Sequence, residues 1–137
     1  FRIRKMHKIY LAITHGKISS KIKEMRDDLI SYDNNKKVIQ KAISYVRIIK
    51  SSSEHTLLEL NPITGRKHQL RKQLYNIGNP VVGDNKYFLK ERIKKTKNKN
   101  TKLMLHAYKI KFMINNIKYN FKATYDKEFE FFLKKKF

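Results

Sequence analysis

The stretch PITGRKHQLRKQLYNIGNPVVGD, which spans Pro62–Asp84, gathers charged and polar side chains into six positions: Arg66, Lys67, His68, Gln69 and Arg71. Like charges within one helical turn repel each other by a few tenths of a kcal/mol, so the cluster calls for a reason. Three interpretations remain open from these residues alone. The cluster is a cradle for phosphate, or an arginine that holds a catalytic carboxylate in its ionised form, or a solvated basic face.

The same stretch predicts a short helix. Apolar side chains follow the cluster at the i, i+4 and i+7 spacing of one helical face: Leu70, Leu74 and Ile77. Thr64 is a candidate N-cap and Gly78 a candidate C′ residue. We therefore expect a helix from Arg66 to about Ile77, with the basic cluster near its start, where free backbone N–H groups attract anions.

Working outward, the chain reads mainly as strands. Apolar, β-branched or alternating segments predict five of them, at Lys8–Gly16, Ala42–Lys50, Thr56–Pro62, Leu103–Ile114 and Lys118–Tyr125. Met25–Ile43 has little clean period beyond a turn at positions 33–35, and Lys90–Lys102 reads as a polar, mobile insertion. A second helix is expected after Asp126, its cap. The pattern predicts an α+β domain with a mixed, mostly antiparallel sheet and a few short helices.

Composition narrows the class of partner. Thirty-three Lys and Arg against eleven Asp and Glu give a formal net charge of +22, which favours a nucleic acid or an anionic membrane. The competing interpretation is an evenly basic surface, with lysine enriched by an AT-rich coding sequence. No apolar run approaches the ~18 residues of a membrane span, and no long amphipathic basic helix stands out. The absence of cysteine suits a cytoplasmic protein, and the scattered histidines match no recognised metal spacing.

Three blocks of the chain resemble the RluA-type RNA pseudouridine synthases. TGRKHQLR followed by GNPVVGDNKY is similar to the family signature in order and spacing across some twenty positions. KIYLAITHG resembles the family's Lys-x-Tyr-x-Ala strand, and LMLHAYKIKF its Leu-His-Ala strand. Gln73 and Asn79 depart from the pattern, because the family usually has His at both positions.

The resemblance implies a fold, a reaction and site residues. The family isomerises uridine to pseudouridine in RNA without a cofactor or a metal. Arg71 matches the arginine that pairs with the catalytic aspartate, Tyr10 the tyrosine that packs on the target base, and Leu105 the apolar residue of the uracil pocket. The remaining polar positions of the motif are expected to contact RNA or support the loop: Arg66, Lys67, His68 and Gln69.

The family's catalytic aspartate lies in a His-Arg-Leu-Asp block before the Tyr10 strand, and no such block occurs in residues 1–137. We therefore expect these residues to be the C-terminal portion of one catalytic domain, inactive alone but able to bind RNA. Large-subunit ribosomal RNA is the expected substrate, with an RluC-like enzyme the nearest match. The uncovered edge is expected to promote self-association. Two alternatives remain open: a noncatalytic basic RNA-binding module, and a ribosome-associated structural protein.

Overall fold

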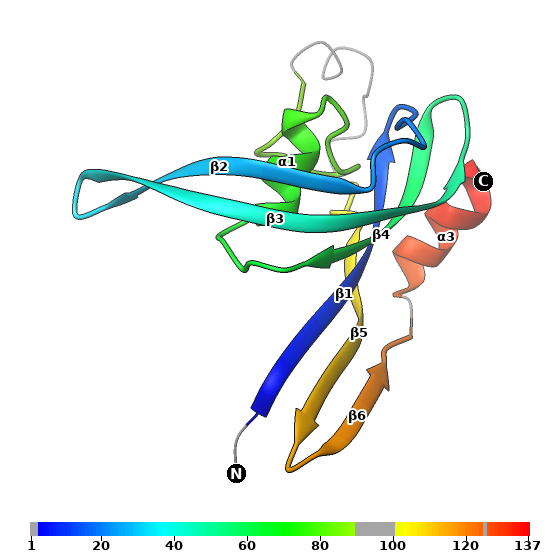
Figure 1. The fold of residues 1–137 in the computed structure, drawn as a ribbon. Helices are drawn as coiled ribbons and strands as arrows, with labels where there is room; N and C mark the ends of the chain where they lie inside the picture. Colours follow the sequence, from blue (N-terminus) through cyan, green and yellow to red (C-terminus); the bar gives the residue numbers. More distant parts are fainter. Residues whose placement is uncertain (1–2, 90–100, 125) are drawn as a thin grey trace.

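A single sheet of six antiparallel strands forms the body of the protein, in the order β2-β3-β4-β1-β5-β6 (Figure 1). The computed structural model describes residues 3–89, 101–124 and 126–137. The strands are β1 (Ile3–His15), β2 (Glu24–Asp33), β3 (Lys36–Ser51), β4 (His55–Pro62), β5 (Leu105–Ile114) and β6 (Ile117–Lys122). The described helices are α1 (Gln69–Asn76) and α3 (Lys127–Lys136). The predicted α+β class with a mostly antiparallel sheet is confirmed.

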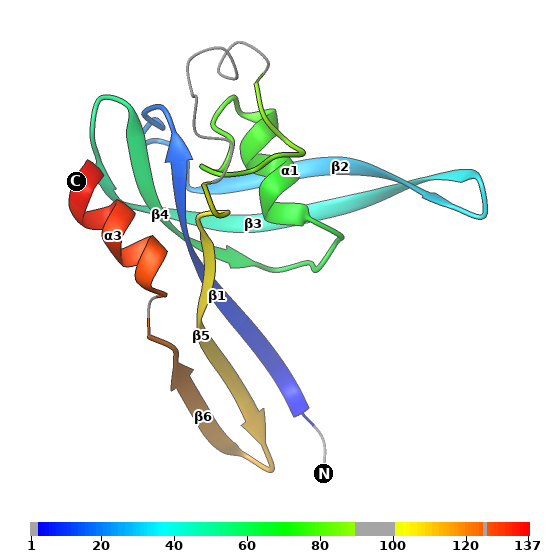
Figure 2. The ribbon, with the colours of Figure 1, turned by 180° about the vertical axis from the view of Figure 1, so that it is seen from behind.

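Two hairpins project from this sheet as arms, β2–β3 at one edge and β5–β6 at the other (Figures 1 and 2). Their tight turns use Asn-Asn pairs with positive φ, at Asn34–Asn35 and Asn115–Asn116, which fits the tolerance of asparagine for the left-handed region. Strand β2 was not predicted. Charged and apolar residues are mixed along it, so its sequence shows little alternation between polar and apolar positions. Its pairing with β3 over ten positions makes it a strand.

The two helices lie on opposite faces of the sheet. Helix α1 packs through Leu70 and Leu74 on the face that carries Leu58 and Leu60 of β4, and all four are buried. Helix α3 covers the other face, where Phe132 makes an edge-to-face contact with His55 at 5.4 Å between ring centroids. Phe129 of α3 is 1% exposed and joins the same core. The core therefore lies on both sides of β1 and β4, the two central strands.

Helix α1 begins at Gln69, three residues later than predicted. The predicted N-cap Thr64 takes another role: its hydroxyl donates to Gln69 Oε1 at 2.7 Å and accepts from the Ile43 amide at 2.9 Å. His68 instead occupies the N-cap position, with φ 53°. At the other end Gly78 has φ 83°, which confirms its predicted place after the helix. The tight turn of residues 64–68 is thus held by tertiary hydrogen bonds.

Helix α3 begins as its sequence predicts. Asp126 is the N-cap, and its carboxylate accepts a hydrogen bond from the Phe129 amide at 2.8 Å. Most of the predicted insertion at Lys90–Lys102 lies outside the described residues. In the part of the chain that the structure describes, no helix is long and apolar enough to cross a membrane.

Candidate active site

An open pocket lies where β1, β5 and the 62–71 segment meet. Its volume is about 490 Å³. Its lining comes from both ends of the sequence: Met6, Lys8, Tyr10, Pro62, Ile63, Thr64, Gly65, Arg66, His68, Gln69, Leu70, Arg71 and Leu105. The pocket therefore brings together Tyr10, Leu105 and four of the five predicted polar residues. Lys67 is exposed and is not among the lining residues.

Tyr10 reaches the pocket from the centre of the sheet. It pairs with Leu60 of β4 and with Ala107 of β5, and the register against β5 shifts between Ile9 and Tyr10. Such irregularities re-aim a side chain relative to the regular pleat. Tyr10 is half-buried, and it lines the pocket together with Leu105. A planar ligand in the pocket can therefore contact an aromatic and an aliphatic side chain at once. The catalytic roles of Tyr10 and Leu105 stay predictions, but their placement in one pocket suits a planar nucleobase.

Gln69 supports the loop. It is 4% exposed, and its Oε1 accepts hydrogen bonds from the Thr64 hydroxyl and, at 3.0 Å, from the Arg66 amide. Its Nε2 donates to the Ile43 carbonyl at 3.1 Å and to Ser44 Oγ at 2.8 Å. Its amide is committed to these partners and is shielded from solvent, and the predicted RNA contact of Gln69 stays a prediction. The alternative role, loop support, is the one that the geometry shows.

Arg71 has a partner that the sequence analysis did not assign to it. Its Nε donates to Asp84 Oδ2 at 2.8 Å and its Nη2 to Asp84 Oδ1 at 2.7 Å, a bidentate pair. The Arg71 side chain is 16% exposed and the Asp84 side chain 0%. Arginine rather than lysine is needed here, because only the planar fork matches both carboxylate oxygens. Within this chain, then, Arg71 joins α1 to the 83–87 loop.

Asp84 also forms the turn that follows it. Its Oδ1 accepts hydrogen bonds from the backbone amides of Lys86 at 3.0 Å and Tyr87 at 2.9 Å. Gly83 precedes it with φ 84°, and a Cβ there would lie 2.1 Å from the Lys102 carbonyl oxygen, so only glycine fits. Burial by itself would raise the pKa of Asp84, but the hydrogen bonds from Arg71, Tyr87 and Lys86 outweigh it and lower that pKa.

This lowered pKa predicts an acid-sensitive fold. A carboxylate whose pKa is depressed by folding stabilises the native state above its unfolded pKa, near pH 4, and loses that contribution as the pH falls through the folded pKa. We expect the melting temperature of the wild type to fall more between pH 6 and pH 2 than that of Asp84→Asn, which has no proton to gain. Thermal scans monitored by circular dichroism measure both slopes. Parallel slopes would contradict the assignment.

His68 lies at the pocket rim in a constrained conformation. Its φ of 53° is uncommon outside glycine, although histidine tolerates it better than bulky residues do. Its Nδ1 lies 3.1 Å from the Tyr87 hydroxyl, and Arg71 lies over the Tyr87 ring at 5.2 Å from the centroid. The pKa of His68 is lowered by burial first and then by the positive charges of Arg71, Lys86 and other lysines. Tyr87, a site residue that sequence reasoning missed, therefore holds both His68 and Arg71.

The two departures from the family pattern serve the fold. Gln73 is fully buried on α1; its Oε1 accepts from Ser44 Oγ at 2.6 Å, and its Nε2 donates to the carbonyls of Met25 and Ala42 at 3.1 and 3.2 Å. Asn79 donates through Nδ2 to the His15 carbonyl at 2.9 Å. Both amides therefore connect the α1 region to the sheet.

The basic side chains that line the pocket are Lys8, Arg66, His68 and Arg71, and no carboxylate is among the described lining residues. Arg66 donates through Nε to the Lys41 carbonyl at 3.0 Å, which directs its guanidinium along the rim. Glu59 is engaged elsewhere, with Arg47 and the Tyr108 hydroxyl. The described residues also contain no group of three or more His, Cys, Asp or Glu placed to hold a metal ion. The arrangement is a basic pocket with an aromatic and aliphatic wall.

Comparison with known proteins agrees with this geometry. The family model described as RNA pseudouridylate synthase matches residues 1–76. An uncharacterized RNA pseudouridine synthase of Helicobacter pylori is 33% identical over 136 residues, which are 95% of this chain and 52% of the relative. The ribosomal large subunit pseudouridine synthase C of Buchnera aphidicola is 33% identical over 133 residues, 90% of this chain and 42% of the relative.

The solved structures show the same fold. Human RNA pseudouridylate synthase domain containing 1 superposes with a TM-score of 0.72 at 20% identity, over 88% of this chain and 55% of that structure. Human RNA pseudouridylate synthase domain containing 4 does so with a TM-score of 0.67 at 24% identity, over 91% and 60%. The chain thus spans about half the length of the relatives it matches. Its matched residues, its pocket and its fold place it in the RluA-type RNA pseudouridine synthase family.

Proposed function

We propose that this chain forms one wall of the active site of an enzyme that isomerises uridine to pseudouridine in RNA. The observation that carries the proposal is the single pocket that joins Tyr10 and Leu105 to the basic turn at residues 65–71. An aromatic ring and an aliphatic side chain suit the two faces of an unpaired pyrimidine, and the cations suit its phosphates. The reaction moves the glycosidic bond from a ring nitrogen to a ring carbon and needs no external group.

Ribosomal RNA of the large subunit is the proposed substrate. Relatives at 33–36% identity carry the name ribosomal large subunit pseudouridine synthase C, including those of Buchnera aphidicola and two Rickettsia species. The net charge of +22 favours a long, folded polyanion over a single nucleotide.

The two arginines of the motif, Arg66 and Arg71, have different roles in the proposal. The structure leaves Arg71 engaged with Asp84, so we assign it to positioning the 83–87 loop and the His68–Tyr87 pair. The predicted role of Arg71, pairing with the catalytic aspartate, stays part of the proposal, because the Asp84 pair uses two of its five N–H donors. Arg66, whose Nε donates to the Lys41 carbonyl, is proposed to contact RNA from the pocket rim. Tyr10 packs on the target base, and Leu105 lines its pocket.

The chain by itself is expected to bind RNA without modifying it. Binding should follow from the basic surface, and turnover should be absent because no described lining residue supplies the carboxylate on which the family's reaction depends. A protein that neutralises about six phosphates loses roughly 10³-fold in affinity between 50 and 200 mM salt, and we expect a dependence of that order. Fluorescence anisotropy with a ribosomal RNA fragment, with Lys67→Ala as a single-phosphate control, measures it.

Turnover is measured on the same RNA by the mass shift that follows derivatisation of pseudouridine. Any pseudouridine formed by the purified chain would refute its dependence on a carboxylate from elsewhere. The alternative, a noncatalytic RNA-binding module, is favoured by the same absence of a carboxylate. The enzyme hypothesis and the RNA-binding-module hypothesis are distinguished by joining this chain to the part of a relative that carries the aspartate block. Only the enzyme hypothesis predicts that the joined protein forms pseudouridine.

A further inference from the structure

Tyr87 contacts two of the basic side chains that line the pocket, although it does not line the pocket itself. Its hydroxyl is 3.1 Å from His68 Nδ1, and its ring meets the imidazole edge to face at 5.7 Å between centroids. The Arg71 guanidinium lies over the same ring, 5.2 Å from the centroid. Tyr87 can therefore influence a ligand in the pocket through His68 and Arg71.

Two segments that are distant in sequence fix this arrangement. The Tyr87 amide donates to Asp84 Oδ1 at 2.9 Å, and the same carboxylate accepts two hydrogen bonds from Arg71. His68 directly precedes α1 with a left-handed backbone at φ 53°. Since the backbone of Tyr87 and the side chain of Arg71 share one carboxylate, the phenol has a defined position against the imidazole.

The contact with Tyr87 leaves one ring nitrogen of His68 for a ligand. His68 lines the pocket, and because Nδ1 lies against the Tyr87 hydroxyl, Nε2 is the nitrogen that a bound group can reach. A neutral imidazole carries one N–H and one lone pair, so the hydrogen bond at Nδ1 decides what Nε2 presents. If the phenol donates to Nδ1, the proton of His68 is on Nε2, and the pocket gains a hydrogen-bond donor.

The surroundings of His68 favour the neutral ring. Burial is the first cause that lowers the pKa of His68, and the positive charges around it lower that pKa further: Arg71, Lys86, Lys67 and Lys72. The carboxylate nearest in the cluster, Asp84, is already engaged by Arg71. His68 therefore differs from the cations beside it. An uncharged donor suits an uncharged acceptor, and a pyrimidine such as uracil carries carbonyl oxygens of this kind.

We propose that Tyr87 is a positioning residue whose hydroxyl donates to His68 Nδ1, so that His68 presents Nε2–H to a carbonyl oxygen of the unpaired pyrimidine. The inference rests on the proposed function and adds to it a polar contact to the base that Tyr10 and Leu105 enclose. A contact of this kind releases no counterions from the RNA, whereas a lysine on a phosphate does. The two kinds of contact therefore differ in their salt dependence.

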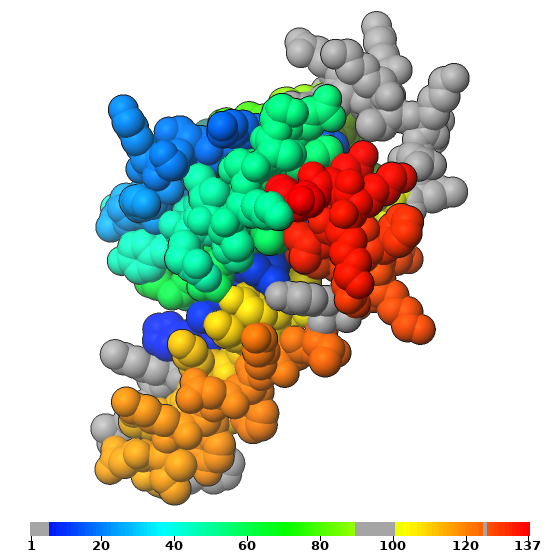
Figure 3. Space-filling view, turned by 90° about the vertical axis from the view of Figure 1, so that its right-hand side faces the viewer, coloured from blue at the N-terminus to red at the C-terminus, as the bar shows by residue number. Residues whose placement is uncertain are grey.

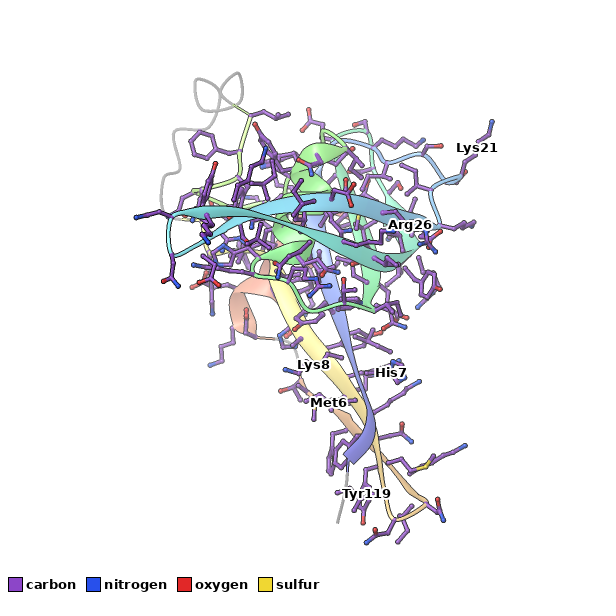
Figure 4. All side chains as sticks on the ribbon, turned by 60° about the vertical axis from the view of Figure 1, so that its left-hand side comes forward. Met6, His7, Lys8, Lys21, Arg26 and Tyr119 are labelled. Atoms are coloured by element: carbon purple, nitrogen blue, oxygen red, sulfur yellow. The ribbon has the colours of Figure 1, made fainter. Side chains whose placement is uncertain are left out.

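The first test is the titration of His68 in the complete chain, followed by NMR of its imidazole. Tyr87→Phe keeps the ring under Arg71 and removes only the hydroxyl, which by our proposal stabilises the neutral imidazole. We expect the pKa of His68 to rise in Tyr87→Phe while the Arg71 Nε–H resonance stays in place. The control is Tyr119→Phe, which should change neither, because Tyr119 lies on the β5–β6 arm that extends away from the body (Figures 3 and 4). A pKa of His68 that falls or does not move in Tyr87→Phe would overturn the proposal.

The second test is affinity for a hairpin RNA whose loop holds a single uridine, and for the same hairpin with an abasic residue there. Tyr87→Phe should bind the uridine hairpin about three- to tenfold more weakly, as the loss of one uncharged hydrogen bond implies, and the abasic hairpin as the wild type does. Its salt dependence should match the wild type, whereas Lys67→Ala should reduce the slope by about one. In a His68→Asn background, which keeps a residue that tolerates the left-handed backbone, Tyr87→Phe should cause no further loss.

Three outcomes of the binding test would contradict the proposal. A loss on the abasic hairpin would move the acceptor to the RNA backbone, and a reduced salt slope in Tyr87→Phe would make the contact a charged one. An undiminished loss in the His68→Asn background would show that Tyr87 acts by another route. A wild-type chain that binds neither hairpin would refute the proposed function itself, whereas a preference for uridine that Tyr87→Phe retains in full would refute only the role of Tyr87.

Discussion

Replacement of Asp84 by Ala should lower the free energy of unfolding by about 3–5 kcal/mol, because it leaves a largely buried guanidinium without its partner. The Asp84 carboxylate accepts four hydrogen bonds, two from Arg71 and two from the backbone amides of Lys86 and Tyr87. Its loss therefore removes the Arg71 pair and the turn together. Urea unfolding monitored by circular dichroism measures the change.

The control for Asp84 is an exposed ion pair. Glu130 and Lys134 lie 3.2 Å apart at i, i+4 on α3, with side chains 48% and 76% exposed, and such pairs contribute about 0.5 kcal/mol or less. If Asp84→Ala costs no more than Glu130→Ala, the buried pair is not a stabilising element. A double-mutant cycle with Arg71→Ala separates the pair from the turn, because Asp84→Ala removes the same turn hydrogen bonds whether or not Arg71 is present, so their loss cancels in the cycle.

Replacement of Gln73 by Leu should cost about 2–4 kcal/mol. The two side chains are similar in size, so little cavity forms, but three hydrogen bonds of about 1 kcal/mol each are lost and their buried partners are left less well satisfied. We also expect the β2–β3 hairpin to loosen, because Gln73 connects α1 to Met25 and Ala42 on its two strands. Denaturant unfolding reports the stability, and amide hydrogen exchange reports the hairpin.

The same substitution at Gln40 is the control. Gln40 lies farther along the hairpin and accepts one long hydrogen bond, 3.5 Å from the Ser31 hydroxyl. Gln40→Leu should change the stability by less than about 0.5 kcal/mol, as surface changes usually do. A Gln73→Leu variant that unfolds at the wild-type denaturant concentration, with unchanged exchange in β2, would show that the buried amide is dispensable.

Local patterns in the sequence were sufficient for much of the fold. The alternation of Tyr108, Ile110 and Phe112 indicates β5, and the Asn-Asn pairs indicate both hairpin turns, because each depends on backbone preferences of neighbouring residues. Asp126 caps α3 as predicted for the same reason. Strand β2 escaped prediction, since its structure depends on ten pairings with β3 rather than on its own alternation.

For the site, the sequence by itself determined which residues belong together: its resemblance to the family assigned Tyr10, Leu105 and the 66–71 cluster to one site, and all of these residues except Lys67 line one pocket. It also determined the family, because order and spacing along the chain survive where identity falls to 33%. Only the tertiary structure decided which partners the polar side chains take. The pairing of Arg71 with Asp84, the burial of Gln69 and the contact of His68 with Tyr87 all depend on contacts between residues far apart in sequence, and their free energies depend on solvent exclusion that no local pattern encodes.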